Sequence, residues 1–302
     1  MVHLGVEMSA FNKYKKEAID KINELIQDME ERERDPLGHS ICLYFLLKSD
    51  LSSPQIDDLV DWMNSWVNRI VNNIQFGRFM DREIVSALFG YYLLRKFNKL
   101  KIKVNEENIS KLITKDIIKN GLYFGDPLYS SLILISIYNF NEQESLNDVV
   151  LKTLREVMFK SNFFNDAKRL IFVSILLEEM GDRSRLEKLV KLCEKRVLEE
   201  GVRFDDGVYY AWILWQYKHF TNRFFRIFDF VRNTLQNAQV FLGLEELERE
   251  TVEFYGKPVH PKFSKIWVSV YVNLISNFES FEPDIAPVTF SFIRKKMMVS
   301  RR

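Results

Sequence analysis

A short pattern recurs along this chain and restricts what it can fold into. Phenylalanine, any residue and aspartate precede a long apolar run four times, at Asp81, Asp126, Asp166 and Asp206. Successive copies therefore start 45, 40 and 40 residues apart. A fifth copy without the phenylalanine begins at Asp35, and we count a sixth, without the aspartate, from His260. A unit repeated at this period predicts a stacked array of helical pairs.

Segments of a second kind lie between the apolar runs. Residues 54–70 carry Ile56, Leu59, Val60 and Met63, an i, i+3, i+4, i+7 spacing that predicts an amphipathic helix. The same spacing recurs in further segments: 11–34, 106–117, 146–157 and 186–197. The Asp-led runs are apolar on nearly all sides, which is typical of a helix covered all round. The alternation predicts an all-α protein with inner and outer layers of helices.

Signals for helix starts support this division. Asp35-Pro36 and Asp126-Pro127 place a capping carboxylate before a proline at the first helical position, and Ser53-Pro54 does the same for an outer helix. We expect each of the five repeat aspartates to cap its inner helix. Only 11 glycines and 7 prolines among 302 residues leave little turn chemistry for a β fold.

The arrangement that we expect is a closed α/α toroid of about six helical hairpins. The alternative is an open α-solenoid of the HEAT type, which has a similar period. An open solenoid leaves inner helices facing solvent, and the inner runs here are too apolar for that, so closure is favoured. We expect one toroid domain over residues 1–280, followed by a linker and basic tail over 281–302.

Two of the repeats resemble a known group of toroids. Gly121-x-x-Phe124-x-Asp126 and Gly201-x-x-Phe204-x-Asp206 are similar to repeats of the terpenoid cyclases and the protein-prenyltransferase β-subunits. The resemblance spans about residues 36–220 and implies a closed toroid with a cavity for an isoprenoid or other apolar substrate. The chemical motifs of the family are missing, because the chain has no Asp-x-Asp-Asp and neither cysteine follows an aspartate two residues earlier. Catalysis is therefore not carried over with the fold.

Composition narrows the possible partners. The 43 basic and 42 acidic residues give a net charge of +1, so a global footprint for nucleic acid is absent. Cys42 and Cys193 stand apart and belong to no zinc motif, which predicts a reducing compartment, taken to be the cytoplasm. No apolar segment is long enough for a membrane span. We expect no metal and no cofactor, even at the doubled acid Asp205-Asp206.

A ligand, if one binds, is expected at the mouth formed by the N-terminal ends of the inner helices. The candidates all lie within about one helical turn of a repeat start. They are His39, Ser86, Ser130, Arg203, Asp206, Tyr210 and His260. Such a mouth suits an amphipathic small molecule, with its polar end at the rim and its apolar end inside. The competing interpretation gives all seven to helix starts and loop packing.

The sequence therefore predicts a binding or scaffolding protein with a central cavity, a protein partner or small ligand, and no recognisable catalytic apparatus. One alternative is an enzyme acting on an isoprenoid or other apolar substrate. A second is a regulatory partner of a nucleic-acid-associated complex, acting through the basic tail. The basic residues of that tail are Arg294, Lys295, Lys296, Arg301 and Arg302.

Overall fold

The structure is a computed structural model that describes residues 2–73, 79–112, 118–119, 121–138, 166–255 and 265–279. These residues are almost entirely helical, so the predicted all-α class is confirmed. The strands in the described ranges form one short antiparallel hairpin, in which β1 (Ile118–Lys119) pairs with β2 (Leu122–Tyr123). None of the described helices is both long and apolar enough to cross a membrane.

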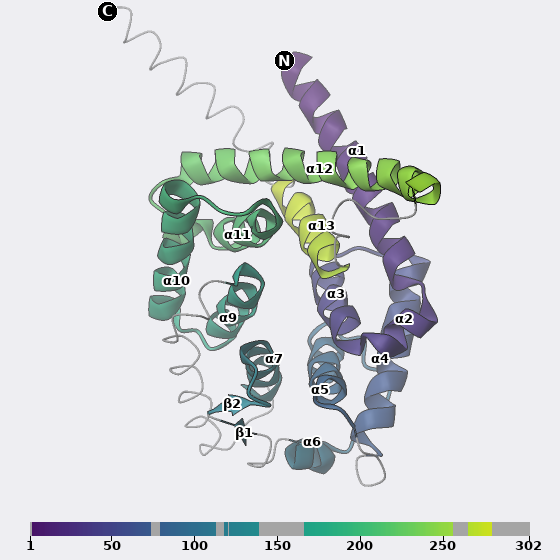
Figure 1. Ribbon diagram of the computed structural model, residues 1–302. Helices are drawn as coiled ribbons and strands as arrows, with labels where there is room; N and C mark the ends of the chain where they lie inside the picture. The colour runs from purple at the N-terminus through teal and green to yellow at the C-terminus, as the bar shows by residue number, and fades with distance from the viewer. Residues whose placement is uncertain are drawn as a thin grey trace, which may run out of the picture.

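Six helices coincide with the six predicted copies of the apolar run, and we call them the inner helices. They are α3 (Pro36–Lys48), α5 (Asp81–Lys96), α7 (Pro127–Tyr138), α9 (Ala167–Glu179), α11 (Phe204–Gln216) and α13 (Lys265–Glu279). Each packs against the next along the chain, and α13 also packs against α3. Figure 1 shows them flanked by the remaining helices. Most of their side chains are buried, as the unbroken apolar runs predict.

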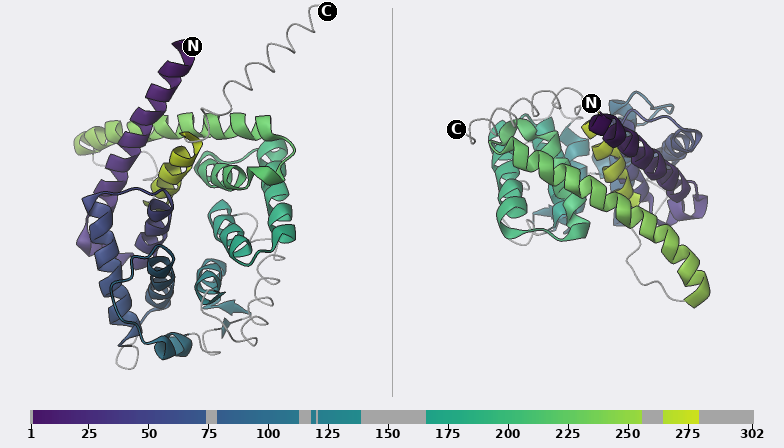
Figure 2. Two further views of the ribbon diagram at one scale, coloured as in Figure 1. Left: turned by 180° about the vertical axis from the view of Figure 1, so that it is seen from behind. Right: turned by 90° about the horizontal axis from the view of Figure 1, so that it is seen from above.

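The remaining helices are the outer helices. They are α1 (Val2–Ile26), α2 (Met29–Arg34), α4 (Pro54–Val71), α6 (Glu106–Leu112), α10 (Arg183–Lys195) and α12 (Phe224–Tyr255). The helix expected over 11–34 is in fact two, because Asp28 caps α2 by accepting a hydrogen bond from the backbone N–H of Glu30 at 2.9 Å. One π-helical turn (Arg196–Glu200) follows α10, and one 3₁₀ turn (Lys218–Phe220) follows α11. Figure 2 shows the long α12 extending past the inner helices. The amphipathic segment 146–157 lies outside the described residues.

The capping prediction is confirmed at three aspartates and wrong at two. Asp35, Asp126 and Asp166 each accept a backbone N–H of the first helical turn, at 3.0, 2.6 and 3.3 Å. Asp81 is already the first residue of α5, where Glu83 instead reaches back to the N–H of the capping residue at 2.6 Å. Asp206 lies inside the first turn of α11, a position where a carboxylate still favours the helix dipole.

Aromatic rings fill the space between inner helices that are not neighbours in the packing order. The ring of Phe45 on α3 lies 6.4 Å from Phe172 on α9 and 5.6 Å from Trp212 on α11. Phe89 on α5 also lies 6.5 Å from Phe172. All four side chains are at most 1% exposed. Where these four rings meet, the space enclosed by the inner helices is a packed aromatic core.

Candidate functional site

Charged and phenolic side chains converge where the inner helices end. Tyr92 and Lys96 lie one turn apart on α5, and both contact Glu179 of α9. The hydroxyl of Tyr92 donates to Glu179 Oε1 at 2.9 Å, and the Lys96 ammonium forms an ion pair with the same oxygen. Beside them, the hydroxyl of Tyr217 donates to Glu178 Oε2 at 2.9 Å. Together with Lys48 we call these six residues the C-terminal cluster.

Lys48 is the last residue of α3, and its ammonium lies among aromatic rings. Its Nζ is 5.2 Å from the ring centre of Trp212 and 5.8 Å from that of Tyr44. Such contacts attract a cation, and the attraction grows as water is removed. Within the part of the chain that the structure describes, this ammonium has neither an ion-pair partner nor a hydrogen-bond acceptor.

Burial sets the protonation of the cluster. Burial lowers the pKa of Lys48. The negative charges of Glu178 and Glu179 act to raise this pKa, whereas the positive charge of Lys96 acts to lower it. Burial, followed by the nearby glutamates, raises the pKa of the phenols of Tyr92 and Tyr217. The phenols are therefore protonated hydrogen-bond donors at neutral pH.

Trp212 packs against the rings of Phe45 and Tyr217, and we call these three rings the aromatic floor of the cluster. A buried amide holds this floor in place. Asn273 of α13 accepts a hydrogen bond from the indole N–H of Trp212 at 2.7 Å. Its own NH₂ group donates to the backbone oxygen of Phe45 at 3.1 Å and to Ser49 Oγ at 2.8 Å. This single side chain links α13 with α11 and with the end of α3. The aromatic floor next to Lys48 is therefore held by contacts from three helices, α3, α11 and α13.

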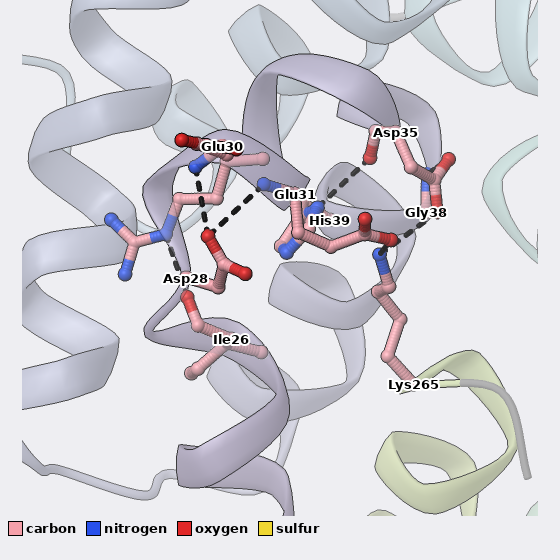
Figure 3. A network of polar contacts seen from close by, with 9 residues as sticks. Ile26, Asp28, Glu30, Glu31, Asp35, Gly38, His39 and Lys265 are labelled. Atoms are coloured by element: carbon pink, nitrogen blue, oxygen red, sulfur yellow. Dashed lines mark hydrogen bonds and ion pairs between the residues drawn. The ribbon is translucent and has the colours of Figure 1, made fainter.

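The predicted site lies at the opposite ends of the inner helices. There His39 is fully buried, its Nδ1 lies 2.9 Å from the backbone oxygen of Asp35, and its Nε2 has no partner. Burial lowers the pKa of His39 to about 4, so the ring is neutral at pH 7. Close by, Lys265 of α13 reaches both Glu31 and Asp35 at 3.0 Å, as Figure 3 shows. This contact joins α13 to α2 and α3.

The hydrogen bonds of three other predicted residues run within one helix, to a neighbouring inner helix or to the preceding segment of the chain. Ser86 Oγ donates to the backbone oxygen of Pro36, and Ser130 Oγ to that of Asp126, both at 2.8 Å. The hydroxyl of Tyr210 accepts from Arg196 at 3.1 Å. Arg203 is exposed and Asp206 is half-buried in the first turn of α11.

Two predicted elements lie outside the described residues. They are His260, from the expected mouth, and the basic tail with Arg294, Lys295, Lys296, Arg301 and Arg302. The ligand site and the tail contact that these residues predict both stay predictions.

Neither thiol has the properties of a nucleophile. Burial raises the pKa of Cys42 and of Cys193 to about 12, so both are protonated at neutral pH. Among the described residues, no group of three or more His, Cys, Asp or Glu side chains is placed to hold a metal ion.

The sequence analysis missed the C-terminal cluster, although the chain carries a signal for it. Tyr44-x-x-x-Lys48 and Tyr92-x-x-x-Lys96 occur at the same place in two successive inner helices, one turn from the helix end. Residues four apart lie on one helix face. The repeated pair therefore indicates a common face with phenol and ammonium groups.

Comparisons of this chain with protein-family models, with curated proteins and with solved structures found no match. The resemblance to the terpenoid cyclases and protein-prenyltransferase β-subunits thus still depends on the residues alone.

Proposed function

We propose that this protein is a closed α/α toroid that binds a small ligand at the C-terminal ends of its inner helices, without chemistry of its own. The observation that carries the proposal is the C-terminal cluster. Charged groups from α3, α5 and α9 surround a packed aromatic floor there. A few polar groups placed above apolar walls are typical of ligand sites.

Closure of the toroid is supported by the packing of α13. This helix packs against α11 on one side and α3 on the other, so the last inner helix meets the first. Deletion of residues 265–302 tests the proposal by hydrogen exchange. In a closed toroid α3 and α11 lose a neighbour at once, and we expect faster exchange in both. Faster exchange in α11 alone would favour the open solenoid.

The packed centre argues against the enzyme alternative. An isoprenoid in the middle of the toroid would occupy the volume in which Phe45, Phe172 and Trp212 meet. The amphipathic ligand that the sequence predicts is therefore better placed on the rim at the C-terminal ends. There its polar groups meet the charged residues, and its apolar part rests on the aromatic floor.

Native mass spectrometry of the purified chain tests the binding proposal. We expect a small molecule that stays bound under gentle ionisation and is released on unfolding. The Tyr92→Phe variant keeps the ring but removes the hydroxyl that donates to Glu179, and it should retain less of the ligand. A bare chain whose melting temperature no compound of a metabolite library raises would contradict the proposal.

A further inference from the structure

Two opposite charges in the C-terminal cluster have no ionic partner in the part of the chain that the structure describes. The ammonium of Lys48 has none among the described residues, and the carboxylate of Glu178 accepts only the neutral hydroxyl of Tyr217 there. The neighbouring pair is different, because Lys96 and Glu179 neutralise each other. Within the described residues, the cluster therefore presents one cation, on the half-buried Lys48, and one anion, on the exposed Glu178, that no other charge neutralises.

The ammonium of Lys48 and the carboxylate of Glu178 lie in the same cluster but do not contact each other. Glu178 accepts the hydroxyl of Tyr217, whose ring lies 6.3 Å from that of Trp212, the ring next to the Lys48 ammonium. The side chains of Lys48 and Glu178 form no direct ion pair. Lys48 is half-buried, and its ammonium lies among aromatic rings without an acceptor among the described residues, so an oxygen atom supplied from outside would stabilise it. The same molecule can satisfy Glu178 if it also carries a cation.

We propose that Lys48 and Glu178 hold the two ends of a small zwitterion, an amino acid or ω-amino acid, with its carboxylate on Lys48 and its ammonium on Glu178. The inference rests on the proposed binding function and names its ligand class. Tyr44 and Trp212, which flank the Lys48 ammonium, form the walls beside the carboxylate.

The surrounding charges favour a zwitterion over a simple anion. Glu178, the carboxylate near Lys48 that no described cation neutralises, would repel a phosphate or a dicarboxylate. A ligand with a single carboxylate and an ammonium instead pairs with Lys48 and Glu178 together. Charge-assisted hydrogen bonds at both ends are the strongest that such a site can offer.

Isothermal titration calorimetry with a series of ω-amino acids tests the proposal. The probes are glycine, β-alanine, γ-aminobutyrate and δ-aminovalerate, with acetate and propylamine as single-charge controls. We expect one chain length to bind best, because the aromatic core between α3 and α9, where Phe45 meets Phe172, fixes the separation of Lys48 and Glu178. Each single-charge control should bind about tenfold more weakly or worse, since one charge-assisted bond is lost.

Variants at the two charges provide the second arm. Lys48→Met and Glu178→Gln keep the length of each side chain and should each weaken the best probe by about tenfold or more. Lys218→Met is the matched control, because Lys218 is also a partly buried lysine over a tryptophan, 4.5 Å from the ring of Trp215. Its affinity should be unchanged.

The outcomes separate this inference from the proposed function. If no zwitterion binds but the copurifying molecule does, the ligand class is wrong and the binding function stands. If zwitterions bind equally well to Lys48→Met and Glu178→Gln, the assignment of the two charges is overturned. If nothing binds at all, both proposals fail.

Discussion

The two ends of the inner helices are built from different kinds of contact. At the N-terminal ends, most hydrogen bonds run from a side chain to backbone a few residues away, as for Ser130 and Asp126. At the C-terminal ends, side chains bond to side chains far along the sequence, as in Tyr92 with Glu179 and Trp212 with Asn273. The first end is set by helix capping, and the second by the tertiary fold.

This difference explains which end is suited to a ligand. Three of the residues that the sequence predicted as ligands, His39, Ser86 and Ser130, are already engaged with backbone oxygens at the N-terminal ends. At the C-terminal ends, Lys48 and Glu178 keep charges that no described residue neutralises. Residues at the first end should therefore affect stability alone, while those at the second should divide between stability and binding.

The largest expected effect is at the aromatic floor. Trp212 is fully buried against Phe45 and Tyr217, and Trp212→Ala should lower the free energy of unfolding by about 3–5 kcal/mol. Urea denaturation measures the loss. Phe225→Ala, which truncates a side chain that is 54% exposed, should stay within about 0.5 kcal/mol of the unmutated chain. A similar loss in both would mean that the floor does not hold the fold.

The next effect concerns the N-terminal ends and depends on pH. The pKa of His39 falls from 6.5 to about 4 on folding, so the unfolded chain binds more protons between these values. Stability is therefore lost as the pH falls through that window, by about 3 kcal/mol in all. His39→Leu should remove this part of the pH dependence in urea titrations. His219→Leu, at an exposed position, should retain it, and identical profiles for His39→Leu and the unmutated chain would contradict the burial of a neutral ring.

A smaller effect is expected at the amide that joins the C-terminal ends. Asn273→Ala leaves the indole N–H of Trp212 without its acceptor and removes the NH₂ group that donates to Ser49 Oγ, at a cost of about 1–3 kcal/mol. In a double-mutant cycle with Trp212→Phe, which also removes the N–H, the losses should not add. Strict additivity would show that the hydrogen bond between the two residues contributes nothing.

How much the sequence could reveal follows from the same contrast. The six inner helices and the caps at Asp35, Asp126 and Asp166 were predictable, because apolar runs and capping carboxylates act over a few residues. The caps predicted at Asp81 and Asp206 are wrong, because both residues lie inside the first turn of their helix and the exact first residue of a helix depends on packing.

The C-terminal cluster escaped prediction for a related reason. Tyr92 meets Glu179, a residue 87 positions away. No pattern in the residues next to Tyr92 or Glu179 predicts that the two side chains are in contact. The repeated Tyr-x-x-x-Lys pair, which was not used as a prediction, indicates one face of two inner helices but neither glutamate.

The smallest expected effect decides whether Ser86 is structural. Its hydroxyl donates to the backbone oxygen of Pro36, which ties α5 to the start of α3. Ser86→Ala should cost about 1 kcal/mol, because the oxygen of Pro36 loses a buried donor. Ser65→Ala is the control, since the Ser65 side chain bonds to Asp61 of its own helix at an exposed position, and this variant should change stability little.

The affinity of Ser86→Ala for the best ω-amino acid should equal that of the unmutated chain. Lys48→Met should instead lose affinity and keep or gain stability, because it removes a poorly solvated charge. Weaker binding by Ser86→Ala at unchanged stability would return the ligand to the N-terminal mouth, and the contrast between the two ends would fail with it.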